Sequence, residues 1–96
     1  FVEAALDGRP LRVYGDGSQT RCFAHVRDCV EALCRLLGNP ASIGEVVNVG
    51  TDSEISIRDL ADRVRETLGV TSATEFIPYE TAHGQPFQDM ARRRPD

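Results

Sequence analysis

The stretch from Leu11 to Asp28 constrains the fold of this chain more than any other. It opens with four residues, Leu11 to Tyr14, whose branched and aromatic side chains are typical of a β-strand. Residues 15–18 are Gly-Asp-Gly-Ser. Glycine adopts positive φ without steric cost, and aspartate and serine bond their own backbone, so these residues favour a tight turn. The sequence therefore predicts a short strand that ends in a tight loop.

Arg21 follows this loop and is the first candidate for ligand binding. Its guanidinium carries a planar fork of donors that matches two phosphate oxygens, and a glycine-containing turn beside it lets an anion approach closely. A diphosphate site is one interpretation. The other is that the loop only joins two strands and Arg21 is solvated, since turns of this kind are common.

The residues after the loop predict an amphipathic helix from Val26 to Leu37. Apolar residues recur there at steps of three and four, and Gly-Asn-Pro at 38–40 ends the pattern. We expect this helix to be well packed. A short extended segment, residues 22–26, leads into it, and His25 fits a structural hydrogen-bond donor better than a catalytic base.

The second half of the chain predicts one more helix between two short strands. Ser56, with an acid three residues later, is a helix N-cap signal, and an apolar stripe follows over residues 57–68. Residues 45–50 form a brief apolar run that predicts a buried strand. Residues 75–79 predict an edge strand, because Pro78 cannot donate a ladder hydrogen bond.

Two polar features in this half leave alternatives open. Asn48 lies in the predicted strand, and a buried amide is costly unless it is bonded, so Asn48 either holds a neighbouring loop or reaches a ligand. The arginine triplet at residues 92–94 is either a solvated tail or a site for an anion.

Composition indicates one small domain with a modest core. The chain has 96 residues and a formal net charge of -4, and all 11 of its basic residues are arginine. The acidic balance argues against nucleic acid as a partner, and no apolar run is long enough to span a membrane. We expect a cytoplasmic location, in which Cys22, Cys29 and Cys34 are buried free thiols.

Two separated motifs carry a resemblance to a known family. Residues 13–28 read Val-Tyr-Gly-Asp-Gly-x-Gln-x-Arg-x-Phe-x-His-Val-x-Asp, and residues 79–96 read Tyr-Glu-x-Ala-x-Gly-x-x-Phe-x-Asp-Met-x-Arg-Arg-x-Pro-Asp. Both resemble the extended short-chain dehydrogenases/reductases that act on nucleotide sugars, such as UDP-glucuronate decarboxylases, dTDP-glucose dehydratases and UDP-hexose epimerases. Cys22 departs from the Asp or Ser that this family tends to carry after the arginine.

The resemblance implies an α/β lobe of short strands and two main helices, about 26–37 and 57–68. Residues 1–96 would form a single partial domain, the C-terminal substrate-binding portion, truncated at both ends. The NAD-binding Rossmann domain would lie outside it. The chain has no lysine, so it lacks the family's catalytic Tyr-x-x-x-Lys pair, and it lacks a Gly-x-x-Gly-x-x-Gly dinucleotide loop. Full-length members use NAD as cofactor.

The resemblance also implies six residues that bind the nucleoside diphosphate: Arg12, Tyr14, Arg21, Asn48, Arg93 and Asp96. Two of them, Arg21 and Arg93, would lie on opposite sides of the diphosphate, and Asp96 would hold the ribose hydroxyls.

The other three residues have less direct roles in the same comparison. The strand around Arg12 and Tyr14 would offer backbone N–H and C=O groups to the pyrimidine, and Asn48 would bond near the diphosphate. The expected partners are a nucleoside diphosphate sugar, the missing NAD-binding domain and a second copy of the chain, whose uncovered apolar faces would associate. The alternative is a stand-alone module that binds nucleotide or associates with itself.

Overall fold

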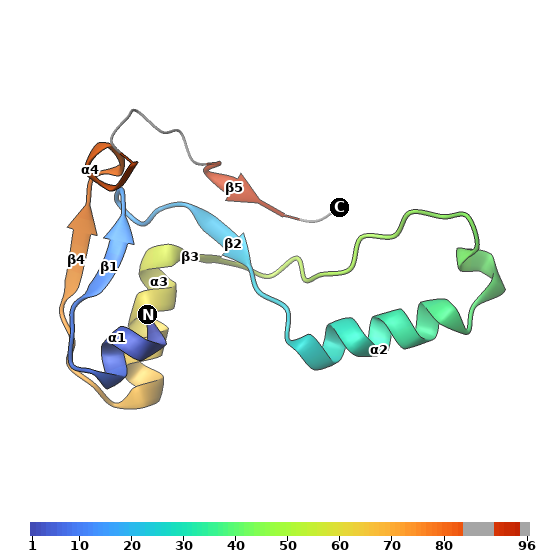
Figure 1. Ribbon diagram of the computed structural model, residues 1–96, viewed down its shortest axis with the longest axis horizontal. Helices are drawn as coiled ribbons and strands as arrows, with labels where there is room; N and C mark the ends of the chain where they lie inside the picture. Colours follow the sequence, from blue (N-terminus) through green and yellow to red (C-terminus); the bar gives the residue numbers. More distant parts are fainter. Residues whose placement is uncertain (84–89, 95–96) are drawn as a thin grey trace.

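The computed structural model describes residues 1–83 and 90–94, and it confirms an α/β chain of short strands (Figure 1). The helical elements are α1 (Val2–Leu6), α2 (Val26–Leu37), the 3-10 turn η1 (Pro40–Ser42), α3 (Ile57–Leu68) and α4 (Tyr79–His83). The strands are β1 (Leu11–Tyr14), β2 (Thr20–Cys22), β3 (Glu54–Ser56), β4 (Thr74–Ile77) and β5 (Arg92–Arg93). The predicted helices 26–37 and 57–68 agree with α2 and α3.

The core lies in a small body formed by β1, β4, α1 and α3. Strands β1 and β4 pair in parallel, with Leu11 opposite Thr74, and α1 and α3 lie beside them (Figure 1). The buried side chains in the described residues are Ala5, Leu11, Val13 and Ala61. The alternation of buried and exposed residues along β1 follows from the two-residue period of a strand, which turns the branched residues inward. This core is small for a chain of 96 residues.

A second sheet of three strands, in the order β3-β2-β5, leaves the body beside α3. Strand β2 is central: it pairs antiparallel with β3 and parallel with β5. It begins at Thr20, earlier than the predicted extended segment 22–26. The reason is tertiary, because Thr20 finds partners on both sides, at Ser56 and Arg92, that no local pattern reveals.

The loop between β1 and β2 lies on the first turn of α3. The Ile57 N–H donates to the Gln19 carbonyl at 3.0 Å, and the Arg58 N–H donates to the Gly17 carbonyl at 3.0 Å. The predicted N-cap is confirmed, since Ser56 Oγ accepts from the Asp59 N–H at 3.0 Å. The first N–H groups of a helix have no partner within it, so these three acceptors satisfy donors that would otherwise cost free energy.

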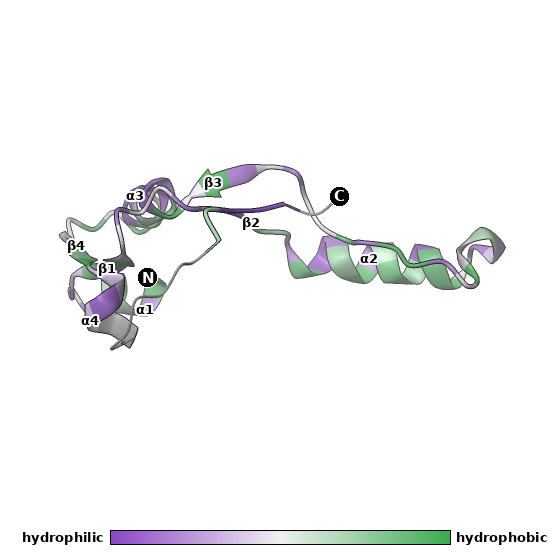
Figure 2. Cartoon of the chain, turned by 90° about the horizontal axis from the view of Figure 1, so that it is seen from above, coloured by the Kyte–Doolittle hydropathy of each residue, from purple (hydrophilic) through white to green (hydrophobic). Residues whose placement is uncertain are grey.

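Helix α2 is not well packed, which corrects the sequence prediction. None of its residues is buried, Leu37 is 90% exposed, and the helix lies well apart from the body in Figures 1 and 2. The Cα radius of gyration is 17.3 Å, against about 12–13 Å for a compact domain of this length. The physical reason is that, among the described residues, only η1 makes substantial contact with the helix.

The predicted buried strand at 45–50 is also wrong. These residues belong to no ladder, and Val46 is 95% exposed. A strand needs a hydrogen-bonded neighbour, and no described segment pairs with this one.

Other local predictions need smaller corrections. His25 is structural, but as an acceptor: its Nδ1 accepts from the Arg27 N–H at 3.1 Å and caps α2. Cys34 is exposed and the other two thiols are half-buried, so the expectation of buried thiols was wrong. The predicted edge strand lies at Thr74–Ile77. None of the helices in residues 1–83 and 90–94 is long and apolar enough to cross a membrane.

Gly17 gives a test of how the loop fits against α3. Its φ is +76°, and an added Cβ would lie 2.9 Å from Val13 Cγ1 and 3.2 Å from Arg58 Cβ. We expect Gly17→Ala to destabilise the fold by more than the ~1 kcal/mol that a left-handed alanine costs by itself. Urea denaturation measures the difference. Gly44→Ala is the matched control, because its φ is +81° and nothing lies within 4 Å; equal losses for the two variants would contradict the prediction.

Candidate functional site

Arg21 and Arg93 are direct partners across the parallel strands β2 and β5, although 72 positions separate them along the chain. Partner residues in adjacent strands project from the same face of a sheet, because side chains alternate with a period of two. The second sheet therefore carries two arginine side chains side by side on one face. The family resemblance implied that Arg21 and Arg93 lie on opposite sides of one diphosphate; the register makes them neighbours, and their role in binding stays a prediction.

The neighbours of Arg93 occupy the opposite face. Arg92 Nε lies 2.6 Å from Glu54 Oε1, and Arg94 Nη2 lies 3.3 Å from Asp52 Oδ2. The Arg93 side chain has no hydrogen-bond or ion-pair partner among residues 1–83 and 90–94. Alternation along β5 and into the residue after it thus separates Arg92 and Arg94, which form ion pairs, from Arg93, whose charge is available to an anion.

Arg21 is half-buried and helps to hold the strands together. Its Nη1 donates to the Met90 carbonyl at 2.9 Å and to the Thr20 carbonyl at 2.7 Å. These bonds fix the base of the guanidinium beside the start of β5. The loop does join two strands, β1 and β2, as the alternative interpretation expected, but Arg21 lies in β2 and is half-buried rather than solvated.

The direction of each backbone N–H and C=O group decides which of them the strand around Arg12 and Tyr14 can present to a ligand. The Leu11 N–H donates to the Ala73 carbonyl and the Gly15 N–H to the Ile77 carbonyl, so odd-numbered residues face β4. The N–H and C=O groups of the even-numbered residues point to the opposite edge of β1, where the Tyr14 carbonyl accepts from Gln19 Nε2 at 3.0 Å.

The side chain of Arg12 is engaged elsewhere. Its Nε lies 3.5 Å from Glu75 Oε2, across the strand pair, and both side chains are exposed. A role for Arg12 in ligand binding would therefore come from its backbone.

Of the other two predicted site residues, Asn48 is described and belongs to neither sheet. Asn48 is exposed in the irregular segment between η1 and β3, so it does not hold a neighbouring loop, and it forms no hydrogen bond within the described part of the chain. Asp96 lies outside the described residues.

Glu54 is a component of the site that sequence reasoning missed. It lies on β3, yet its Oε2 accepts from Thr20 Oγ1 of β2 at 3.1 Å and its Oε1 from Arg92 Nε of β5. The bond from Arg92, with a smaller contribution from Thr20, lowers the pKa of Glu54 below its ordinary value of 4.5. No sequence signal could have found it, because 38 residues separate Glu54 from Arg92.

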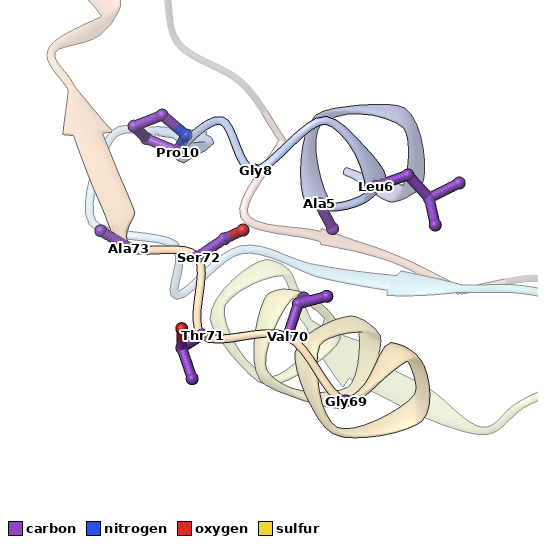
Figure 3. A pocket seen from close by; sticks show the side chains of 9 residues that line it. All are labelled: Ala5, Leu6, Gly8, Pro10, Gly69, Val70, Thr71, Ser72 and Ala73. Atoms are coloured by element: carbon purple, nitrogen blue, oxygen red, sulfur yellow. The ribbon is translucent and has the colours of Figure 1, made fainter.

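One cavity of about 500 Å³ lies away from the arginine pair, between the end of α1 and the α3–β4 connection (Figure 3). Its lining residues carry no charge: Ala5, Leu6, Gly8, Pro10, Gly69, Val70, Thr71, Ser72 and Ala73. Without an acid, a base or a cation, these residues offer no catalytic group. No group of three or more metal-ligating side chains occurs in residues 1–83 and 90–94.

Comparison with known proteins identifies the family. The model of the NAD dependent epimerase/dehydratase family matches residues 1–50. The chain belongs to this family. The family predicted from the two motifs is thereby confirmed.

Individual members of the epimerase/dehydratase family match over most or all of the chain. A UDP-N-acetyl-alpha-D-glucosaminuronate decarboxylase from Bacillus cytotoxicus is 38% identical over 96 residues, which are 100% of this chain and 30% of that protein. A UDP-glucose 4-epimerase from Mycolicibacterium smegmatis is 42% identical over 78 residues, which are 81% of this chain and 25% of that protein. The chain thus spans less than a third of the length of these relatives.

A solved epimerase of the family shares the fold. The crystal structure of UDP-glucuronic acid 4-epimerase from Bacillus cereus, in complex with UDP-glucuronic acid and NAD, aligns with a TM-score of 0.79 and 28% identity. The alignment covers 99% of this chain and 29% of the epimerase. Because nearly every residue is included, the outward position of α2 lies within the similarity.

The lowered pKa of Glu54 makes its contribution to stability depend on pH. Because the folded-state pKa lies below 4.5, this contribution is complete above pH 4.5 and is lost as the pH falls through the lowered value. We expect Arg92→Ala to return the pKa toward 4.5, and Arg94→Ala to change it less because Arg94 contributes least. A carbon-13 NMR titration of the Glu54 carboxyl group measures this. An unchanged pKa in Arg92→Ala would contradict the prediction.

Proposed function

We propose that this chain is the nucleotide-sugar-binding portion of an NAD-dependent epimerase, dehydratase or decarboxylase. The observation that carries the proposal is the register that makes Arg21 and Arg93 neighbours on one face of the second sheet. Two guanidinium groups side by side match the charge of a diphosphate and its several acceptor oxygens. The relatives named above supply the substrate class, because their names refer to UDP-sugars.

The remaining contacts of the proposed site follow from the strand edge and the chain end. The outward N–H and C=O groups of Arg12 present a donor and an acceptor, as a pyrimidine edge requires, and the Tyr14 carbonyl, which already accepts from Gln19 Nε2, has a second lone pair. Asp96 on the ribose hydroxyls and Asn48 near the diphosphate complete the proposal. The assignment of the chain to the C-terminal portion of such an enzyme stays a prediction.

The residues present do not fit NAD. The natural place for a dinucleotide phosphate is a glycine loop that opens onto a helix N-terminus. Here the loop at residues 15–19 closes onto α3, whose first N–H groups donate to Gln19, Gly17 and Ser56. We therefore propose that NAD and the catalytic tyrosine and lysine belong to protein outside these residues, and that the chain does not catalyse the reaction alone.

The apolar face of α2 indicates what the chain needs around it. Val26, Val30, Leu33 and Leu37 recur at helical spacing and are at least half exposed. An apolar face of this kind drives association. Since the epimerase from Bacillus cereus aligns with 99% of this chain but has more than three times its length, the remainder of such a protein is the proposed cover, with a second copy of the chain as its substitute in isolation.

Substitution of the paired arginines tests the diphosphate site. We expect Arg21→Ala and Arg93→Ala each to weaken UDP binding about 10- to 100-fold in the protein encoded by the complete reading frame, which is the loss for one charge-assisted contact. Isothermal titration with UDP measures this. Arg12→Ala is the matched control, because its side chain pairs with Glu75 and only its backbone is assigned to the ligand.

The contradicting result is equal binding in wild type and Arg93→Ala. The same titration with the 96-residue chain separates the two candidate functions. A lobe that needs the rest of an enzyme binds UDP weakly or not at all. Binding as tight as in the complete reading frame would favour the alternative, a stand-alone nucleotide-binding module.

The exposed face of α2 gives a second test. We expect the isolated chain to form dimers or larger species, because association removes apolar side chains from water. Leu33→Glu places a charge in the centre of that face and is expected to shift the population toward monomer. Light scattering measures the mass. Arg27→Glu, an exposed polar position on the same helix, is the control, and a monomeric wild-type chain would contradict the prediction.

A further inference from the structure

We propose that Glu54 is a positioning residue for the arginine pair, since its carboxylate ties β5 to β2 and thereby sets Arg93 beside Arg21. This inference rests on the proposed function for its consequence in binding. Its structural part stands on contacts within the second sheet and can be tested separately.

Few contacts hold β5 in place. The strand comprises Arg92 and Arg93, both exposed, and β2 is its only partner strand within residues 1–83 and 90–94. Its described attachments near the pair are the Thr20 N–H to the Ala91 carbonyl at 2.9 Å, Arg21 Nη1 to the Met90 carbonyl, and Arg92 to Glu54. A strand this short depends on its side-chain contacts, because two residues supply few ladder bonds.

The Glu54 carboxylate joins all three strands. Its two oxygens accept from different strands, Oε2 from Thr20 on the central strand and Oε1 from Arg92 on the far edge, so the side chain reaches across the sheet. The Glu54 side chain is only 19% exposed while that of Arg92 is 65% exposed, so the carboxylate end of this ion pair is shielded from solvent.

Because of strand geometry, the contact between Glu54 and Arg92 also determines the face of the sheet from which Arg93 projects. Consecutive side chains of a strand project to opposite faces. When Glu54 holds Arg92 on one face, Arg93 must project from the other, where Arg21 lies opposite it in register. Glu54 therefore acts on the proposed ligand through Arg93 without touching it.

The neighbouring ion pair provides the internal comparison. Asp52 and Arg94 are separated by 3.3 Å, and their side chains are 77% and 47% exposed. A pair with this exposure contributes little, because water and salt screen both charges. Asp52→Ala is accordingly the matched control for Glu54→Ala.

The first experiment measures β2–β5 pairing without any ligand. We expect Glu54→Ala to speed amide hydrogen exchange at the Thr20 N–H about three- to tenfold and to weaken cross-strand nuclear Overhauser effects between Arg21 and Arg93. Asp52→Ala should change neither. The charge-reversed double variant, Glu54→Arg with Arg92→Glu, should restore both, which general destabilisation would not do.

The second experiment measures UDP binding by a double-mutant cycle in the protein encoded by the complete reading frame. We expect Glu54→Ala to weaken binding about three- to tenfold in wild type and not at all in Arg93→Ala, because its effect passes through Arg93. A purely structural loss would weaken both backgrounds equally.

The two experiments test separate parts of the proposal, and a different result contradicts each part. Unchanged Thr20 exchange in Glu54→Ala, or no recovery in the charge-reversed variant, overturns the positioning role. Equal weakening in both backgrounds overturns its route through Arg93. If the wild-type protein shows no UDP binding, the proposed function fails, while the exchange experiment still decides whether Glu54 positions β5.

Discussion

The structure depends on the contact between the β1–β2 loop and the first turn of α3. Each partner supplies what the other lacks: the helix has N–H groups without acceptors, and the loop has carbonyls that a tight turn leaves unpaired. Asp16 makes the loop rigid, since Ser18 donates to it through both hydroxyl and amide and lowers the pKa of the Asp16 carboxyl. This contact joins the body to the second sheet and fixes where β2 begins.

The geometry of the proposed site depends on the contact between this loop and α3. Once β2 leaves the loop in a fixed direction, its two edges recruit β3 and β5 from distant parts of the sequence. The arginine pair then results from register, and we propose that the ion pair of Glu54 with Arg92 sets which arginine of the triplet meets Arg21. The proposed anion site is compatible with a net charge of -4, because the local arrangement of charges outweighs the net charge at short range.

The extended shape has the same physical origin as the function that we propose. Apolar residues on α2 and in the segment 43–53 remain exposed, and the buried core consists of small or medium side chains in the body. A chain that places this much apolar surface in water gains stability when a partner covers it. The membership in the epimerase/dehydratase family and the short span relative to its members agree with a chain that functions within a larger assembly.

Local pattern was sufficient for several elements of the fold. Short-range signals, which extend over no more than four residues, predict the strand at residues 11–14, both main helices and the Ser56 cap. The signals are the hydrophobic period and the capping chemistry. The prediction of a strand at residues 45–50 was wrong for the opposite reason. Their apolar run fits a strand, but a strand exists only when a second segment accepts its hydrogen bonds.

The sequence by itself therefore determined which segments would be helical, because helical period and capping follow from side-chain chemistry and short-range spacing. Tertiary structure alone decided the register that pairs Arg93 with Arg21, the contact between Glu54 and Arg92, and the position of α2 apart from the core. These outcomes depend on register and on contacts between residues tens of positions apart, and no local pattern encodes either.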